Sequence, residues 1–219
     1  MKRREFLKIS AATMLGLVMD GIFDRSIAST SMPDRKNNLL IKDKSITIYT
    51  ELNYKNVQKK NPHWGIVSRS GKLQDKAILK AYVDAITFHD ALTGIGAKPG
   101  NNLTEDNIGV SVKGDLLNVT AYWEASRPYH LKEILEDTSG RGFKIRFGGN
   151  REMALKEKTG CIMCLESCWI GITSNDIYPN ISNFKRMLSP NSQFKGNEAV
   201  LPKIDGHPVI VKFELVAVQ

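Results

Sequence analysis

The sequence predicts an α+β fold: one strand-dominated domain with two short helices. Several segments of five to nine residues alternate between apolar and polar side chains, which is the two-residue period of a strand. Two segments instead have apolar residues at helical spacing, and no internal repeat divides the chain. With 219 residues and 42% hydrophobic composition, the chain is long enough to bury one sizeable core.

The first predicted strand covers residues 46–52, where apolar side chains at Ile46, Ile48 and Leu52 alternate with polar ones. Residues 64–68 and 76–83 predict two more strands, separated by the turn signal Arg69-Ser70-Gly71.

A helix is predicted to begin after Asp84, because a carboxylate at this position accepts hydrogen bonds from free amides of the first turn. The apolar residues that follow share one helical face and lead into glycines that end the helix: Phe88, Ala91, Leu92, Ile95, Gly94 and Gly96.

The second half of the chain is predicted to contain more strands than helices. A short second helix is expected around Leu131 to Leu135, entered near Pro128 and ended by Ser139-Gly140. The segment that holds the cysteines is predicted to be a loop. The predicted strands are 109–112, 116–124, 143–147 and 208–216.

The N-terminus predicts export from the cytoplasm. Arg3-Arg4-Glu5-Phe6-Leu7-Lys8 resembles the twin-arginine export signal, and the apolar run 9–19 is too short for a membrane anchor. Small residues at Ser26 and Ala28 predict cleavage after Ala28. We therefore expect an export signal over 1–28, a flexible leader over 29–40 and one domain over 41–219. The mature protein is expected to be periplasmic or extracytoplasmic, with no membrane span.

Charge and motifs indicate neither a nucleic-acid partner nor a recognisable enzyme. Removal of the signal takes away five basic and three acidic residues, so the formal charge falls from +8 to +6. The remaining basic residues are scattered, with the densest cluster at 55–60 and no interleaved aromatic residues, which argues against nucleic-acid binding. No Ser/His/Asp order or paired carboxylates indicate a catalytic site.

The chain's three cysteines, Cys161, Cys164 and Cys168, lie within eight residues. Their C-x2-C-x3-C spacing matches the last three cysteines of a bacterial ferredoxin run, so we predict that they bind an iron–sulfur cluster. A four-iron cluster needs a fourth ligand, such as a carboxylate or one of the four histidines, whereas a three-iron cluster needs none. The histidines are His63, His89, His130 and His207.

Three alternatives remain open for the cysteines. Cys161 and Cys164 form a C-x-x-C pair that can exchange disulfides. Two of the thiols can instead form a disulfide that closes the loop of a non-enzymatic periplasmic binding or scaffold domain. A zinc site made of the three cysteines and one histidine is the third.

Several stretches resemble a family of exported bacterial proteins called YdjY-like, often described as iron–sulfur proteins with no established biochemical role. One departure is Trp169, which stands where the family pattern has proline after the last cysteine. The resemblance implies an exported domain and favours a cluster at the three cysteines. A cluster there would allow electron exchange with a membrane or periplasmic redox partner. The matching stretches are 63–67, 75–82, 88–92, 96–102, 142–150, 205–209 and the cysteine segment from Gly160 to Asn175.

Overall fold

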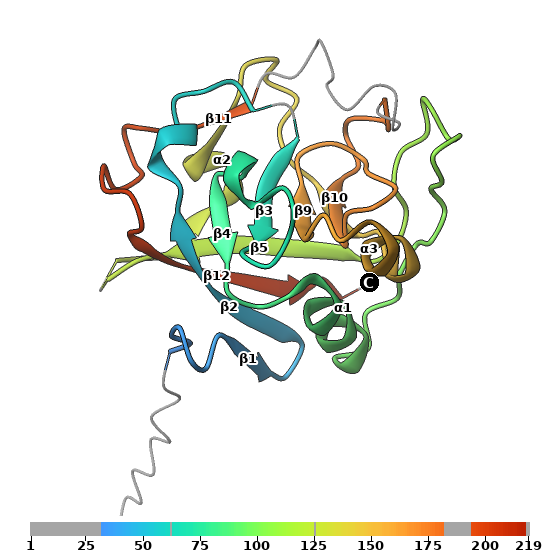
Figure 1. Cartoon of the computed structure of the whole chain (residues 1–219), viewed down its shortest axis with the longest axis horizontal. Helices are drawn as coiled ribbons and strands as arrows, with labels where there is room; N and C mark the ends of the chain where they lie inside the picture. Colours follow the sequence, from blue (N-terminus) through green and yellow to red (C-terminus); the bar gives the residue numbers. More distant parts are fainter. Residues whose placement is uncertain (1–31, 62, 125, 182–193, 218–219) are drawn as a thin grey trace, which may run out of the picture. The chain divides into compact units, whose positions relative to one another are not determined.

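In the part of the chain that the structure describes, eight strands of a ten-stranded β-sheet close on themselves as a barrel (Figure 1). The computed structural model describes residues 32–61, 63–124, 126–181 and 194–217. The predicted export signal and cleavage site lie outside the described residues. The barrel strands, in chain order, are β2 (Ser45–Leu52), β3 (Trp64–Ser68), β4 (Leu79–Ala81), β5 (Leu116–Tyr122), β8 (Ile145–Phe147), β9 (Cys161–Cys164), β10 (Thr173–Asn175) and β12 (Pro208–Leu215).

Around the barrel the strands follow the order β2-β12-β5-β8-β10-β9-β3-β4, and β4 pairs with β2 to close the ring. The pairs β3–β4 and β9–β10 are parallel, whereas the other pairs are antiparallel. Four shorter strands lie outside the ring: β1 (Leu39–Lys42) on β2, β6 (Tyr129–His130) on β5, and β7 (Leu135–Asp137) paired with β11 (Phe194–Gly196).

The α+β prediction is therefore wrong. The described chain has three short α-helices, α1 (Ala85–Gly94), α2 (Leu131–Ile134) and α3 (Arg151–Glu157), and none of them forms a layer. Two 3₁₀ turns, η1 (Tyr54–Asn56) and η2 (Gln74–Lys76), complete the regular structure. The decisive difference is at the cysteine segment: Cys161–Cys164 is strand β9, not a loop, and it joins β3 to β10.

A second local prediction is also wrong. Residues 109–112 alternate like a strand, but they form no strand in the structure. Side chains hold this stretch instead: the Asn102 amide donates to the carbonyl of Ser111, and the Ser167 hydroxyl accepts from the amide of Val112.

The main core fills the barrel with fully buried aliphatic and aromatic side chains. Phe213 of β12 packs edge-to-face on Phe88 of α1, with ring centres 4.9 Å apart. This contact joins α1 to the barrel. The helix begins as predicted, because the carboxylate of Asp84 accepts hydrogen bonds from the amides of Ile86 and Thr87.

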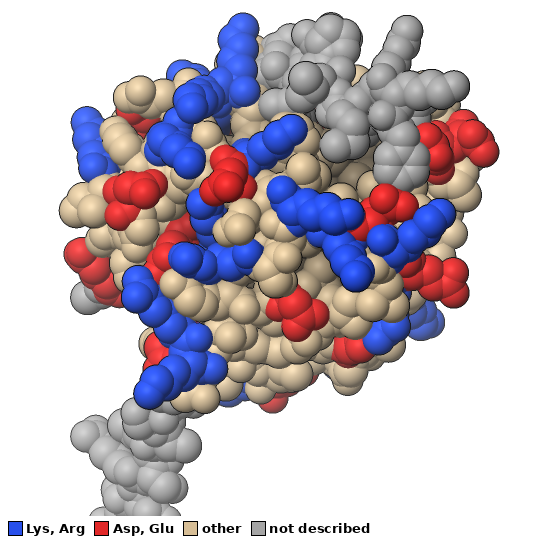
Figure 2. Space-filling view, in the orientation of Figure 1, with Lys and Arg blue, Asp and Glu red and all other residues tan. Residues whose placement is uncertain are grey.

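Acidic side chains lie among the lysines and arginines on the face of the molecule in Figure 2. Among the described residues, no helix has the length and apolar character that crossing a bilayer requires.

Candidate metal centre

Strand β9 presents two of the cysteines to one side through irregular pairing with β3. In a regular strand, residues three apart point to opposite faces. Here the register slips by one residue at Gly65 and again at Ile162. Such a bulge redirects side chains. As a result, Cys161 and Cys164 share one buried cluster with Trp64, whereas Ile162 belongs to the main core.

Cys168 lies in the segment between β9 and β10, and Ser167 fixes that segment. The Ser167 hydroxyl accepts from the amide of Val112 at 2.9 Å and donates to the carbonyl of Asn175 at 3.1 Å. Its own amide donates to the carbonyl of Tyr178 at 2.9 Å. A buried Asn150 amide donates to the carbonyls of Cys168 and Gly171, both at 2.9 Å. The cysteine segment is therefore anchored on both sides.

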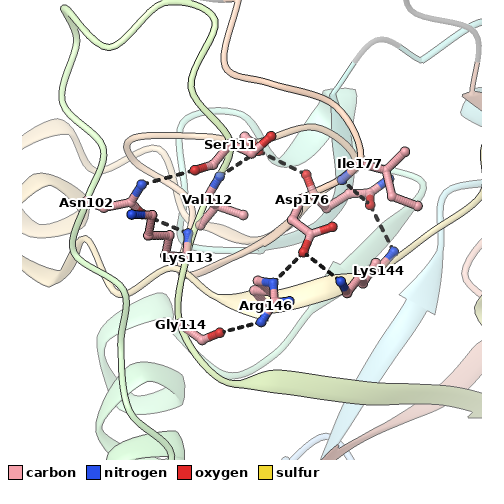
Figure 3. Close-up of polar contacts among 11 residues, drawn as sticks. Asn102, Ser111, Val112, Lys113, Gly114, Lys144, Arg146, Asp176 and Ile177 are labelled. Atoms are coloured by element: carbon pink, nitrogen blue, oxygen red, sulfur yellow. Dashed lines mark hydrogen bonds and ion pairs between the residues drawn. The ribbon is translucent and has the colours of Figure 1, made fainter.

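The segments that anchor Ser167 are themselves held by polar contacts (Figure 3). Asn102 binds Ser111 and Lys113, and the Asp176 carboxylate accepts from Arg146 while lying 3.6 Å from the Lys144 ammonium. This network ties residues 102–114 to β8 and to the chain that follows β10.

The fold brings His63, about 100 residues earlier in the sequence, to Cys164 and Cys168. One donor atom from each of the three residues lies within 4.8 Å of the others, and all three residues are buried. Asn61 positions the histidine, because its side-chain oxygen accepts from the amides of His63 and Trp64. These residues lie close enough to bind a metal ion.

Cys161 lies in the same buried cluster as Cys164 and Cys168 but is not one of the three donor residues. Hydrogen bonding with Cys164 lowers the pKa of Cys161. All three cysteines are free thiols, so the disulfide of the alternative interpretation is not formed. The remaining histidines, His89, His130 and His207, are not in the donor group.

The electrostatics of the group stabilise a thiolate on Cys168. Hydrogen bonding with Cys164 and the neighbouring His63 charge hold the pKa of Cys168 well below its ordinary value. The amides of Ile170 and Gly171 also point at its sulfur, at 3.4 and 3.2 Å. By contrast, hydrogen bonds with Cys161 and Cys168 raise the pKa of Cys164.

Burial alone would lower the pKa of His63, but the Cys168 charge and hydrogen bonds with Cys168 and Glu166 raise it well above its ordinary value. Without a metal, these shifts favour an imidazolium beside a thiolate. A metal that binds here would displace the imidazolium proton to solvent, because only a neutral imidazole and a thiolate are metal ligands.

Glu166 is a site residue that the sequence argument missed. Its carboxylate is buried, and one oxygen lies 3.8 Å from Nδ1 of His63. A histidine that binds a metal commonly directs its other ring nitrogen to a carboxylate, which fixes the orientation of the ring. Its position in the sequence between Cys164 and Cys168 could have indicated that Glu166 lies near the site.

The fold and this site together define a β-barrel protein with a buried thiol–imidazole group of metal-binding composition. A family model described as "YdjY domain" matches residues 41–214. The chain therefore belongs to the YdjY family. The "Uncharacterized protein YdjY" of Escherichia coli (strain K12) is 35% identical over 160 residues, which are 72% of this chain and 69% of that protein. No solved structure gives a significant match.

Proposed function

We propose that this protein binds one thiophilic transition-metal ion at His63, Cys164 and Cys168, with Cys161 as the fourth ligand. The observation that carries the proposal is the 4.8 Å limit on the distances among the first three donors. A tetrahedral ion with metal–sulfur bonds of about 2.3 Å holds its ligand sulfurs about 3.8 Å apart. Side-chain movements of ångström size would therefore complete the site.

The donor set supports zinc or iron as the ion. Thiolates and imidazole suit zinc, iron and copper(I), whereas magnesium and calcium prefer oxygen ligands. Four protein ligands leave no open position for a substrate, which is the arrangement of structural zinc and of electron-transfer sites. We therefore assign no catalytic reaction to the centre.

An iron–sulfur cluster is the second candidate. It is supported by the cysteine spacing and by the two amides that point at the sulfur of Cys168, since hydrogen bonds to sulfur tune the reduction potential of such clusters. A cluster places several atoms between its ligands, so it requires wider separation of the donors than one ion does. An iron ion or a cluster would each allow electron exchange with a redox protein, whereas zinc would not.

The proposal includes export of the loaded protein through the twin-arginine route. The hexapeptide from Arg3 to Lys8 supports this route, which carries folded proteins. Burial of all four donor residues also supports it, because metal binding at a closed site is coupled to folding of the chain.

The test is metal analysis of the full-length chain, expressed in the cytoplasm and purified without oxygen. We expect one zinc or iron per chain, lost in His63→Asn and retained in His89→Asn. The control is matched, since His89 is also buried and lies outside the donor group. Several irons with an equal amount of sulfide would favour the cluster, and a metal-free wild-type protein would refute both candidates. Export is tested separately by replacing Arg3 and Arg4 with lysine, which we expect to block it.

A further inference from the structure

Ser174 is a buried residue of β10 whose hydroxyl is unpaired. The residue is 0% exposed, and its Oγ has no hydrogen-bond partner among the residues that the structure describes. Buried hydroxyls are nearly always bonded, so an exception calls for an explanation such as a ligand or a redox role.

The unpaired hydroxyl lies beside the metal-binding group. Ser174 is the register partner of Cys164 in the parallel pair of β10 with β9, and register partners project on the same face of a sheet. Gly171 locates the two side chains further. A Cβ built on this glycine would lie 2.5 Å from the Cys164 sulfur and 3.4 Å from the Ser174 hydroxyl. Both atoms therefore border the same narrow space.

The preceding residue provides the contrast. Thr173 is equally buried, and its hydroxyl donates to the carbonyl of Ile162 at 2.8 Å. A backbone acceptor thus satisfies the hydroxyl of Thr173, whereas the described part of the chain offers none to the hydroxyl of Ser174.

We propose that Ser174 is a positioning residue of the metal centre, whose hydroxyl donates a hydrogen bond to the Cys164 sulfur when that sulfur is a metal-bound thiolate. The inference rests on the proposed function. A thiol loses its proton when it binds a metal, and an anionic acceptor forms a much stronger hydrogen bond than a neutral one. Ser174 would then serve Cys164 as the amides of Ile170 and Gly171 serve Cys168.

The test compares full-length wild type with Ser174→Ala. We expect Ser174→Ala to weaken zinc binding about 10-fold, as is usual for residues that support metal ligands, in titrations against a competing chelator. The sulfur-to-metal absorption of the cobalt-loaded protein should shift as well. Stability of the metal-free variant should not decrease, because the lost hydroxyl had no partner. Thr173→Val should do the opposite: it should lower the stability of the metal-free protein and leave zinc affinity unchanged.

The outcomes separate the two proposals. If wild type and Ser174→Ala bind zinc equally and their cobalt spectra coincide, the role of Ser174 is refuted and the metal site stands. If the metal-free Ser174→Ala protein is destabilised as much as the loaded one, the hydroxyl is structural and the inference also fails. A wild-type protein that binds neither zinc, cobalt nor iron overturns the proposed function, and this inference with it.

Discussion

Two buried clusters meet at β9, and they differ in kind. The main core contains aliphatic and aromatic side chains, including Ile162 and Met163 of β9. The smaller cluster contains the three cysteines with Trp64 and Trp169. Buried polar groups border the smaller one, among them His63, Glu166 and Ser174.

The comparison shows how one strand can serve stability and chemistry together. Apolar packing is stabilising without further conditions, whereas buried polar and ionisable groups need partners. Because β3 and β9 pair irregularly, Ile162 and Met163 of β9 lie in the main core, whereas Cys161 and Cys164 of the same strand lie in the smaller cluster. We therefore expect changes in the main core to affect folding alone and changes in the thiol cluster to affect metal binding most.

The largest effect on stability is expected from a substitution in the main core. Phe213→Ala removes a fully buried ring and should lower the free energy of unfolding by about 3–5 kcal/mol. Urea unfolding of the metal-free and zinc-loaded proteins should show the same loss in both forms. Unequal losses would mean that the two clusters are coupled through β9.

A smaller effect on stability, but a larger one on metal binding, is expected at Gly171. In Gly171→Ala the new methyl carbon would lie 2.5 Å from the Cys164 sulfur, so one of them has to move. Overpacking should cost about 1–3 kcal/mol, and zinc affinity should fall by about 100-fold. Chelator competition measures the affinity.

Gly94→Ala is the matched control. A Cβ at this position in α1 meets nothing within 4 Å, so stability should rise by up to about 1 kcal/mol with no change in affinity. If both alanine variants retain zinc equally, Gly171 does not shape the centre.

The smallest effect on stability is expected at Glu133, an acidic residue of α2 that belongs to neither cluster. Arg127 and the amide of His130 bind Glu133, which lowers the pKa of this carboxyl from 4.5 to about 2. Because the folded value is the lower one, the contribution to stability is present above pH 4.5 and is lost as the pH falls toward 2. Exposure keeps it small.

Thermal unfolding of wild type and Glu133→Gln between pH 2 and pH 6 checks this prediction. The two proteins should differ slightly at the upper end of the range and converge at the lower end. A difference that grows as the pH falls would contradict the assignment.

The elements that could be predicted are those with a strong local signal. Alternation predicted strands over 46–52 and 208–216, which are β2 and β12 in the structure, and Asp84 predicted the start of α1. The α+β class failed because β9 and β10 are buried on both faces and so do not alternate. α3 was missed because Ala154 is its only buried residue, which leaves no apolar stripe.

The candidate site was predictable only in part. Clustering in the sequence was enough to single out Cys161, Cys164 and Cys168, and the structure brings them into one cluster. The choice of His63 among four histidines could not be made, because it depends on the pairing of β3 with β9. The role of Ser174 could not be predicted either, because Ser174 lies beside Cys164 only through the register of β10 on β9.

The distance in sequence between His63 and the cysteines has a consequence for folding. A bound ion would join two points about 100 residues apart and so act as a reversible cross-link between the two halves of the barrel. Closing so long a loop is entropically costly, and in the folded barrel the pairing of β3 with β9 holds these ligands together. A bound ion would thus be a sign that the barrel is closed. Removal of the ion would make the closed barrel easier to unfold.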